Sequence, residues 1–316
     1  MTYPPVLVLT GPTAVGKTAL SLPVAERLGG EVISCDARQI YRQLTIGTAK
    51  PDPADLARIP HHFIDERDLE EPYSAGMYER EALRRIAEVF SRGRIPIVVG
   101  GSTLYLHALL HGLDPLPPAQ PELRRWLTER ARREGWAALY AELEHLDPQM
   151  AQTLDPTKTQ RLLRALEVYY ATGKPISSFF GQRKTRPFRF APLVLIRDRR
   201  HLYRRIDDRV LSMIERGLVE EVRALWEQGY SPELNALRTT GYMELFPYLR
   251  GEYDLERAIY LIQRNTRHYA KRQHTWFRRD PALRTWIDLD QLEGSGQDPA
   301  DWVCRWWEQA LAHAEL

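Results

Sequence analysis

Short apolar runs alternate with amphipathic segments in the first third of the chain. The runs at 6–9, 31–35 and 95–99 are rich in valine, isoleucine and leucine, and each is followed by polar residues or glycine. Runs of this length predict buried strands. Between them, residues 17–28 and 75–90 repeat apolar side chains at helical spacing. Strands that alternate with helices predict an α/β fold with a doubly wound parallel sheet, which binds ligands at the carboxyl ends of its strands.

This alternation stops at residues 112–122, which contain four prolines. From there to residue 172 the pattern is helical without a strand signal, and a strand pattern returns at 193–196. The interruption predicts an all-helical domain inserted into the α/β domain. We expect the α/β domain to comprise residues 1–115 and 190–316, and the insertion to comprise residues 116–189.

The C-terminal part is mostly helical in pattern, over 200–279 and again over 299–315. The segment "RNTRHYAKRQHTWFRR" (264–279) carries six Arg or Lys residues and no acid. It predicts a basic helical face, and Arg267, Lys271 and Arg272 are its candidates for contact with an RNA backbone. A solvated surface helix with aromatic residues in the core is the alternative.

Composition narrows the class of protein without naming it. The chain has 316 residues, 43% of them hydrophobic, and a net charge of +2, which is typical of a globular protein. A nucleic-acid surface would therefore depend on local clusters of basic residues. Two cysteines and no apolar run long enough to span a bilayer favour a cytoplasmic protein that contacts no membrane.

The strongest motif is "GPTAVGKT" (11–18), between the first predicted strand and the first predicted helix. It fits the phosphate-loop pattern, in which glycines let backbone N–H groups face an anion at a helix N-terminus. Lys17 is expected to bridge phosphate oxygens, and the Thr18 hydroxyl to bind Mg²⁺.

A nucleoside triphosphatase also needs a strand that ends in a carboxylate for Mg²⁺. The strand at 95–99 ends in Gly100-Gly101-Ser102 instead. Asp198 follows the strand at 193–196 between two arginines, and we interpret it as part of a structural ion pair. Asp36 follows the second strand, where it could accept a proton from a nucleophile; a helix cap or an acid beside Mg²⁺ is an equal alternative.

Eight motifs in order are similar to those of the tRNA dimethylallyltransferase family, the bacterial type of tRNA isopentenyltransferase. They span about residues 5–279 and read "GPTAVGKT", "SCDARQIYRQLTIGTAKP", "PHHFID", "YSAGMY", "VVGGSTLYLHALLHGL", "DPTKTQRLLRALEVYYATGKPIS", "RTTGYMEL" and "TRHYAKRQHTWFRR". The resemblance implies transfer of a dimethylallyl group from dimethylallyl diphosphate to N6 of the adenosine 3′-adjacent to the tRNA anticodon. We also expect Mg²⁺ as the cofactor and a monomer.

The resemblance also implies roles for single residues. Asp36 matches the family's catalytic acid, and Lys17 with Arg209 would stabilise the departing diphosphate, although Arg204 and Arg205 are close rivals of Arg209. The diphosphate would lie on Gly11, Pro12, Thr13, Ala14, Val15, Gly16, Lys17 and Thr18. The anticodon stem-loop would contact Asp36, Ala37, Arg38, Gln39, Ser102, Arg124, Gln160, Arg161, Leu162, Leu163, Arg164, Arg238, Thr239, Thr240, Gly241, Tyr242 and Met243.

Two departures and two alternatives accompany the resemblance. Ala37 stands where many members have serine, and Ser102 stands where threonine is usual. From the residues alone, a small-molecule or nucleotide kinase would share the phosphate loop and the sheet. A non-catalytic RNA-binding protein that uses a nucleotide as a switch is a third possibility. The missing strand-end acid disfavours both.

Overall fold

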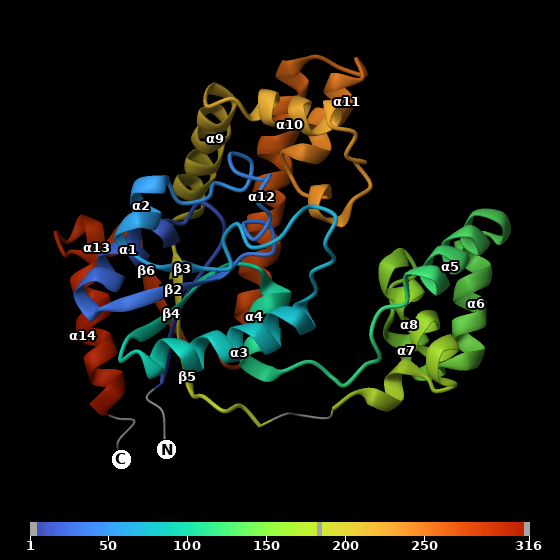
Figure 1. Cartoon of the computed structure of the whole chain (residues 1–316), viewed down its shortest axis with the longest axis horizontal. Helices are drawn as coiled ribbons and strands as arrows, with labels where there is room; N and C mark the ends of the chain where they lie inside the picture. Colours follow the sequence, from blue (N-terminus) through green and yellow to red (C-terminus); the bar gives the residue numbers. More distant parts are fainter. Residues whose placement is uncertain (1–4, 182–184, 313–316) are drawn as a thin grey trace. The chain divides into compact units, whose positions relative to one another are not determined.

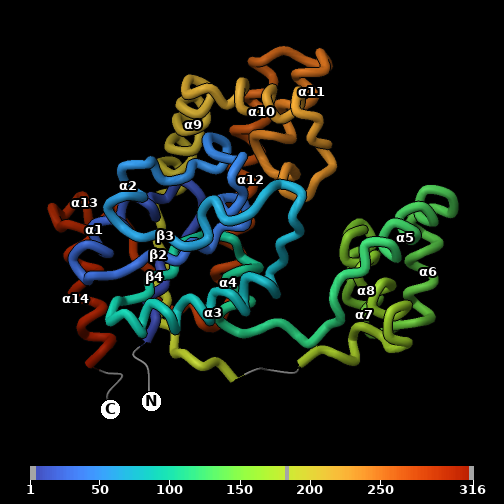
Figure 2. The backbone as a smooth tube through the Cα atoms, viewed as in Figure 1, coloured from blue at the N-terminus to red at the C-terminus, as the bar shows by residue number. Residues whose placement is uncertain are grey.

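The computed structural model describes residues 5–181 and 185–312. The chain divides into two compact units. The first comprises Met1–Leu110 with Arg186–Leu316, and the second comprises His111–Thr185. Figure 2 shows the chain leaving the first unit after α4 (Thr103–His111) and returning to it at β5 (Phe190–Ile196).

A parallel sheet forms the centre of the first unit. Its six strands are ordered β3-β2-β4-β1-β5-β6, and every neighbouring pair is parallel. The strands are β1 (Val6–Thr10), β2 (Gly30–Cys35), β3 (His61–His62), β4 (Ile95–Gly100), β5 and β6 (Thr285–Asp288). All five residues of β1 are buried, as its apolar sequence requires, because β1 lies between β4 and β5 and is covered on both faces.

Helices surround this sheet, and two of them cover one side together (Figure 1). α1 (Lys17–Leu28) begins after Gly16 and ends before Gly29. Both flanking glycines have a positive φ, a backbone conformation that glycine adopts with little strain. α14 (Pro299–Ala312) packs beside α1 and buries Trp307 in the same hydrophobic core. The other helices are α2 (Pro53–Arg58), α3 (Ala75–Ser91), α4, α9 (Arg199–Glu215), α10 (Leu218–Glu227), α11 (Tyr242–Leu249), α12 (Leu255–Arg279) and α13 (Leu289–Gly294).

The second unit is helical and has a hydrophobic core of its own. Its helices are α5 (Pro121–Glu134), α6 (Trp136–Leu146), α7 (Pro148–Thr153) and α8 (Thr159–Thr172). Glu167 is fully buried in it and accepts a hydrogen bond from the backbone N–H of Gln120 at 2.6 Å. Arg164 pairs with Glu167 at 3.1 Å, so a buried carboxylate fixes the start of α5 against α8.

The predicted fold class is confirmed. The strands and helices expected at 6–9, 17–28, 31–35, 75–90 and 95–99 are all present within one or two residues of those bounds. Three details differ. β5 begins at Phe190 instead of residue 193, and the short strands β3 and β6 were not expected because neither has an apolar run of strand length. The predicted final helix is present as α14 up to Ala312, and residues 313–315 lie outside the described residues.

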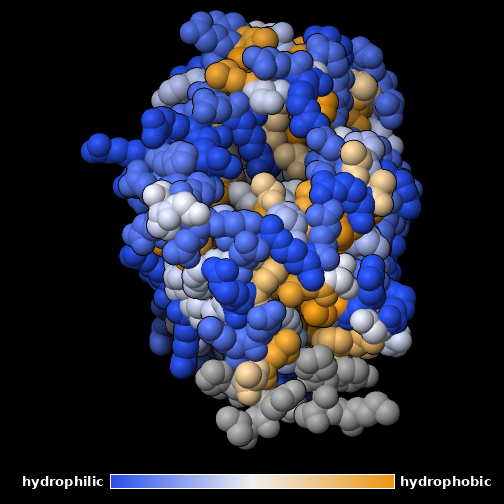
Figure 3. All heavy atoms as spheres, turned by 90° about the vertical axis from the view of Figure 1, so that its left-hand side faces the viewer, coloured by the Kyte–Doolittle hydropathy of each residue, from blue (hydrophilic) through white to orange (hydrophobic). Residues whose placement is uncertain are grey.

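No helix in the described ranges is long and apolar enough to cross a membrane. Figure 3 shows the side that carries α13 and α14, where hydrophilic residues dominate and hydrophobic side chains occur only in small groups. This face has the character of an ordinary protein surface exposed to water.

Candidate active site

The phosphate loop joins β1 to α1, and its backbone is held open by specific contacts. Ala14 and Gly16 both have a positive φ, of 63° and 114°. The Nε of Arg197 donates a hydrogen bond to the carbonyl of Val15 at 2.9 Å, and the Nε of Arg205 donates one to the carbonyl of Ala14 at 3.0 Å. Because arginines bind these carbonyls, the loop keeps a shape in which its N–H groups can face an anion.

Arg197, one of these two arginines, is itself held in place by α13. Only 5% of the Arg197 side chain is exposed, and its guanidinium pairs with Asp290 and Glu293, each at 2.5 Å. This ion pair holds the pKa of Glu293 below its usual value. Through Arg197, the acidic residues of α13 therefore stabilise the phosphate loop.

Lys17 occupies the inside of the loop. Its Nζ donates to the carbonyls of Gly11 and Pro12, both at 2.9 Å. Burial and the nearby positive charge of Arg209 lower the pKa of Lys17 to about 8. A bound diphosphate would favour the charged ammonium and raise this pKa again, so anion binding and protonation of Lys17 are linked.

This linkage predicts that affinity for a diphosphate ligand falls at high pH. Above about pH 8 the empty site loses the Lys17 proton, so the dissociation constant for an organic diphosphate is expected to rise by up to about tenfold per pH unit. Isothermal titration calorimetry without tRNA measures it. In Lys17→Met the affinity is expected to be weaker and nearly constant over the same range. A wild-type affinity that stays constant up to about pH 9.5 would contradict the role given to Lys17.

Asp36 lies directly after β2, at the same edge of the sheet as the phosphate loop. Its Oδ1 accepts hydrogen bonds from the backbone N–H groups of Arg38 at 2.8 Å and Gln39 at 3.3 Å. Within the described residues, no hydrogen bond is formed by Oδ2. The next residue, Ala37, donates its N–H to the Ser102 hydroxyl at 2.9 Å, which fixes the Asp36 turn against the loop after β4.

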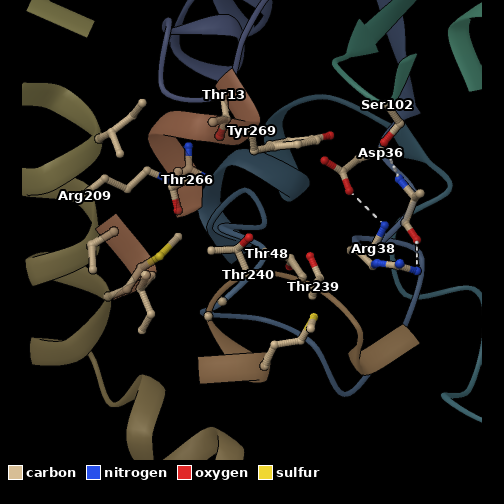
Figure 4. A pocket seen from close by; sticks show the side chains of 18 of the residues that line it. Thr13, Asp36, Arg38, Thr48, Ser102, Arg209, Thr239, Thr240, Thr266 and Tyr269 are labelled. Carbon is tan, nitrogen blue, oxygen red and sulfur yellow. Dashed lines mark hydrogen bonds between the residues drawn. The ribbon is translucent and has the colours of Figure 1, made fainter. Parts of the chain in front are cut away.

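Two adjoining cavities, each of about 430 Å³, meet at Asp36. The phosphate-loop cavity is lined by Thr13, Ala14, Gly16, Lys17, Thr18, Ala19, Asp36, Gln39, Thr48, Ala49, Gly101, Arg205, Asp208, Arg209, Tyr269 and Gln273. The helical cavity lies against α9 and α12 and is also lined by Ala37, Arg38, Ser102, residues 238–241 and Met243. Thr13, Asp36, Thr48, Arg209 and Tyr269 line both. Figure 4 shows Arg209 and Asp36 reaching inward from opposite sides, with the Tyr269 ring between them.

A triphosphatase would carry a carboxylate for Mg²⁺ at the end of a strand such as β4. Here β4 ends at Gly100 and Gly101 follows, and neighbouring atoms of the protein leave no room for a side chain at either position. A Cβ on Gly100 would come within 2.2 Å of the Cys35 carbonyl oxygen. A Cβ on Gly101 would come within 2.6 Å of the Gln273 amide nitrogen and 2.9 Å of the Gly11 carbonyl oxygen. The two glycines are therefore required for this close packing, and no side chain fits in their place.

The structure distinguishes the three candidate arginines of α9. Arg209 lines both cavities, and burial lowers the pKa of its guanidinium. Arg205 lines the phosphate-loop cavity and supports Ala14, whereas Arg204 is exposed and lines neither cavity. Asp198 does not form the ion pair that we expected. It caps α9 instead, accepting hydrogen bonds from the backbone N–H groups of Arg200 and His201.

Several residues expected to contact tRNA have their side chains engaged inside the protein. Leu162 and Leu163 are 0% and 2% exposed in the core of the helical unit, because α8 turns this face inward. Tyr242 is fully buried and donates its hydroxyl hydrogen to Glu221 at 2.5 Å. Direct contact of these three side chains with RNA is not compatible with this packing.

Two arginines of the expected set are partly committed to neighbours. Arg267 pairs with Asp207 on α9. Arg164 donates to the Pro117 carbonyl at 2.5 Å and pairs with Glu167. Gln160, Arg161 and Lys271 are exposed, and Arg272 is exposed and lines the helical cavity. Arg124 is half-buried and reaches Gln160, with Nη2 at 3.3 Å from Oε1.

Sequence reasoning missed Thr48 and Glu221 as residues that shape the cavities, and it assigned Gln39 and Tyr242 to tRNA without their contacts inside the protein. Thr48 lines both cavities, and Gln39 donates to the carbonyls of Thr48 and Ala49 at 3.2 and 3.1 Å. Glu221 accepts hydrogen bonds from the backbone N–H groups of residues 45–47 at 2.7–3.2 Å. The Tyr242 ring covers Gly47, where a Cβ would come within 2.5 Å of it. Local sequence patterns do not predict such contacts, because the partners are far apart in the sequence.

Fold and cavities together define an α/β phosphate-loop protein in which a carboxylate faces the phosphate site and a second cavity opens beside it. The model of one family, described as IPP transferase, matches residues 39–280. The tRNA dimethylallyltransferase of Salinibacter ruber is 52% identical over 276 residues, 87% of this chain and 85% of that protein. That of Chlorobium chlorochromatii is 44% identical over 299 residues, 93% of this chain and 96% of that protein.

Two solved structures are similar over most of the chain. The full-length tRNA isopentenylpyrophosphate transferase of Bacillus halodurans has a TM-score of 0.71 at 34% identity, covering 99% of this chain and 100% of that one. A eukaryotic dimethylallyltransferase acting on tRNA has a TM-score of 0.78 at 32% identity, covering 92% of this chain and 76% of that one. The chain belongs to the IPP transferase family.

Proposed function

We propose that this protein transfers a dimethylallyl group from dimethylallyl diphosphate to N6 of the adenosine on the 3′ side of the tRNA anticodon. The single observation that carries the proposal is the pair of adjoining cavities that share Asp36 and Arg209. One cavity contains the phosphate loop and suits the diphosphate. The other is bordered by polar loops and α12 and suits an adenine that has left its stack in the anticodon loop. The names of the similar proteins support both substrates.

The reaction follows from the groups that face the shared space. The N6 lone pair attacks C1 of the dimethylallyl group, the C1–O bond breaks, and its electron pair leaves with the diphosphate. Asp36 accepts the proton that N6 loses as the C–N bond forms. Lys17, Arg209 and the N–H groups of the phosphate loop stabilise the negative charge that builds on the departing diphosphate.

The residues of the phosphate-loop cavity fit a magnesium ion. The Thr18 hydroxyl and the carboxylates of Asp36 and Asp208 line this cavity, and hard oxygen groups of this kind are what Mg²⁺ prefers. When bound, the ion would neutralise part of the diphosphate charge. We assign Thr18 as its protein ligand.

On the acceptor side, we propose tRNA contact by the residues that line or border the helical cavity. These are Asp36, Ala37, Arg38, Gln39, Ser102, Arg238, Thr239, Thr240, Gly241, Met243, Lys271 and Arg272. In the helical unit we propose contact by Arg124, Gln160 and Arg161. We also propose that the protein acts as a monomer, and action on tRNA supports a cytoplasmic location.

The decisive experiment incubates the protein with Mg²⁺, labelled dimethylallyl diphosphate and unmodified tRNA. We expect label in the RNA at the adenosine next to the anticodon, located by nuclease digestion, and release of diphosphate. A parallel reaction with γ-labelled ATP tests the kinase alternative, which the comparisons do not favour. Transfer from ATP without any label from the prenyl donor would overturn the proposal.

A further inference from the structure

One buried amide joins the two halves of the proposed active site. Gln273 on α12 is 2% exposed, and both ends of its side-chain amide are bonded. Its Oε1 accepts the backbone N–H of Thr13 in the phosphate loop at 2.9 Å. Its Nε2 donates to the carbonyl of Gly101 at 2.7 Å. A buried amide with both partners in place fixes the separation of the two backbone segments that it bridges.

The Gly101 end of this bridge leads to the catalytic acid. Ser102 follows Gly101, and its hydroxyl accepts the N–H of Ala37 at 2.9 Å, next to Asp36. The Thr13 end leads to the diphosphate, because Thr13 belongs to the phosphate loop and lines both cavities. Gln273 thus connects the donor site to the acid through two backbone contacts and one hydroxyl.

The part of α12 that carries Gln273 is packed against the protein core. Ala270 and Phe277, one turn to either side of Gln273, are 1% and 0% exposed, so this face of the helix is buried. Tyr269 and Arg272, on the same two turns, line the helical cavity. The same helix therefore forms a wall of the proposed adenine site and positions the loop that holds the donor.

We propose that Gln273 is a positioning residue that sets the distance between the diphosphate and Asp36 through Thr13 and Gly101. The inference rests on the proposed function. Gln273 takes no proton and supplies no charge to the reaction. Its loss leaves both substrates able to bind but displaces them from the productive alignment, where a shift of about 1 Å can cost about 100-fold in rate.

The test uses Gln273→Met, which keeps the volume of the side chain and removes both hydrogen bonds. In single-turnover transfer with saturating donor and tRNA, we expect a rate about 10–100-fold below wild type. Affinity for tRNA is expected to stay within about twofold and the melting temperature within a few degrees. The matched control is Gln263→Met on the same helix. Among the described residues, Gln263 donates to the Asp207 carbonyl alone, at 3.3 Å, and it lines neither cavity, so the rate of Gln263→Met is expected to be unchanged.

A second variant separates hydrogen bonding from packing. Gln273→Glu keeps an acceptor for Thr13, but its ionised second oxygen faces the Gly101 carbonyl and cannot donate. Protonation restores a donor, so the rate of Gln273→Glu relative to wild type is expected to rise as pH falls. Lys17, Arg205, Asp208, Arg209 and Asp36 line the same cavity in both proteins, so the pH profile of the wild type is measured alongside to show their own contribution.

A wild-type rate in Gln273→Met would overturn the inference, and so would a ratio for Gln273→Glu that does not change with pH. If the wild-type protein labels no tRNA, the proposed function fails on its own account. Gln273 is then judged by binding of inorganic diphosphate with Mg²⁺. We expect about three- to tenfold weaker binding in Gln273→Met because the Thr13 backbone is released, and equal affinity would overturn the inference.

Discussion

Replacing Asp36 with asparagine is expected to lower the single-turnover rate of dimethylallyl transfer about 10²–10⁴-fold. The asparagine amide oxygen can still accept the backbone N–H groups of Arg38 and Gln39, so the turn keeps its shape. What is lost is the proposed acceptor of the N6 proton, because an amide has no useful basicity. Quenched transfer reactions with labelled donor measure the rate. Calorimetric titration with the donor is expected to give an affinity within a few-fold of wild type.

The chain provides a closely matched control in Asp198. This aspartate also follows a strand of the parallel sheet, and its Oδ1 also accepts two backbone N–H groups, at 2.8 and 3.2 Å. It lines neither cavity, so Asp198→Asn is expected to leave the rate unchanged. If Asp36→Asn transferred the group as fast as Asp198→Asn, Asp36 would be only a turn-forming residue. That outcome would remove the general base from the mechanism.

Local sequence patterns were enough to locate the phosphate loop and Asp36. Both follow directly on short apolar runs, and the carboxyl ends of parallel strands meet at one edge of the sheet. The choice among Arg204, Arg205 and Arg209 needed the orientation of α9. Leu202, Ile206 and Val210 are buried on one side of that helix. Arg205 and Arg209, one turn apart, line the phosphate-loop cavity, whereas Arg204 is exposed and does not line it.

The contacts that adjust the site could not be predicted in this way. Gln273 bonds to a backbone N–H 260 residues away and to a carbonyl 172 residues away, and Glu221 bonds to backbone N–H groups of residues 45–47. Backbone partners carry no side-chain signature, and an isolated Gln or Glu on a helix is usually solvated. Leu162 and Leu163 were expected to contact tRNA because the whole motif was assigned to it, but their side chains face the core of the helical unit.

Replacing Arg209 with alanine is expected to reduce the transfer rate about 10²–10³-fold by removing a positive charge from the departing diphosphate. The guanidinium lines both cavities and is half-buried, so water screens its attraction to the developing charge less than it would for an exposed arginine. Because the charge grows as the C1–O bond breaks, the rate constant of the bound complex is expected to change more than donor affinity. Single-turnover transfer and donor titration, measured on the same preparation, separate the two effects.

Variants of the two other candidate arginines on α9, Arg204 and Arg205, serve as comparisons for Arg209→Ala. Arg204→Ala removes an exposed charge from α9 and is expected to leave rate and affinity unchanged. Arg205→Ala removes the hydrogen bond to the Ala14 carbonyl, so it is expected to weaken donor binding more than it slows the bound complex. Arg209→Lys keeps the charge but not the planar fork and is expected to recover part of the rate. If Arg205→Ala slowed the chemical step and Arg209→Ala only weakened binding, the two roles would have to be exchanged. The leaving group would then depart toward the phosphate loop alone, away from the space that Arg209 shares with Asp36.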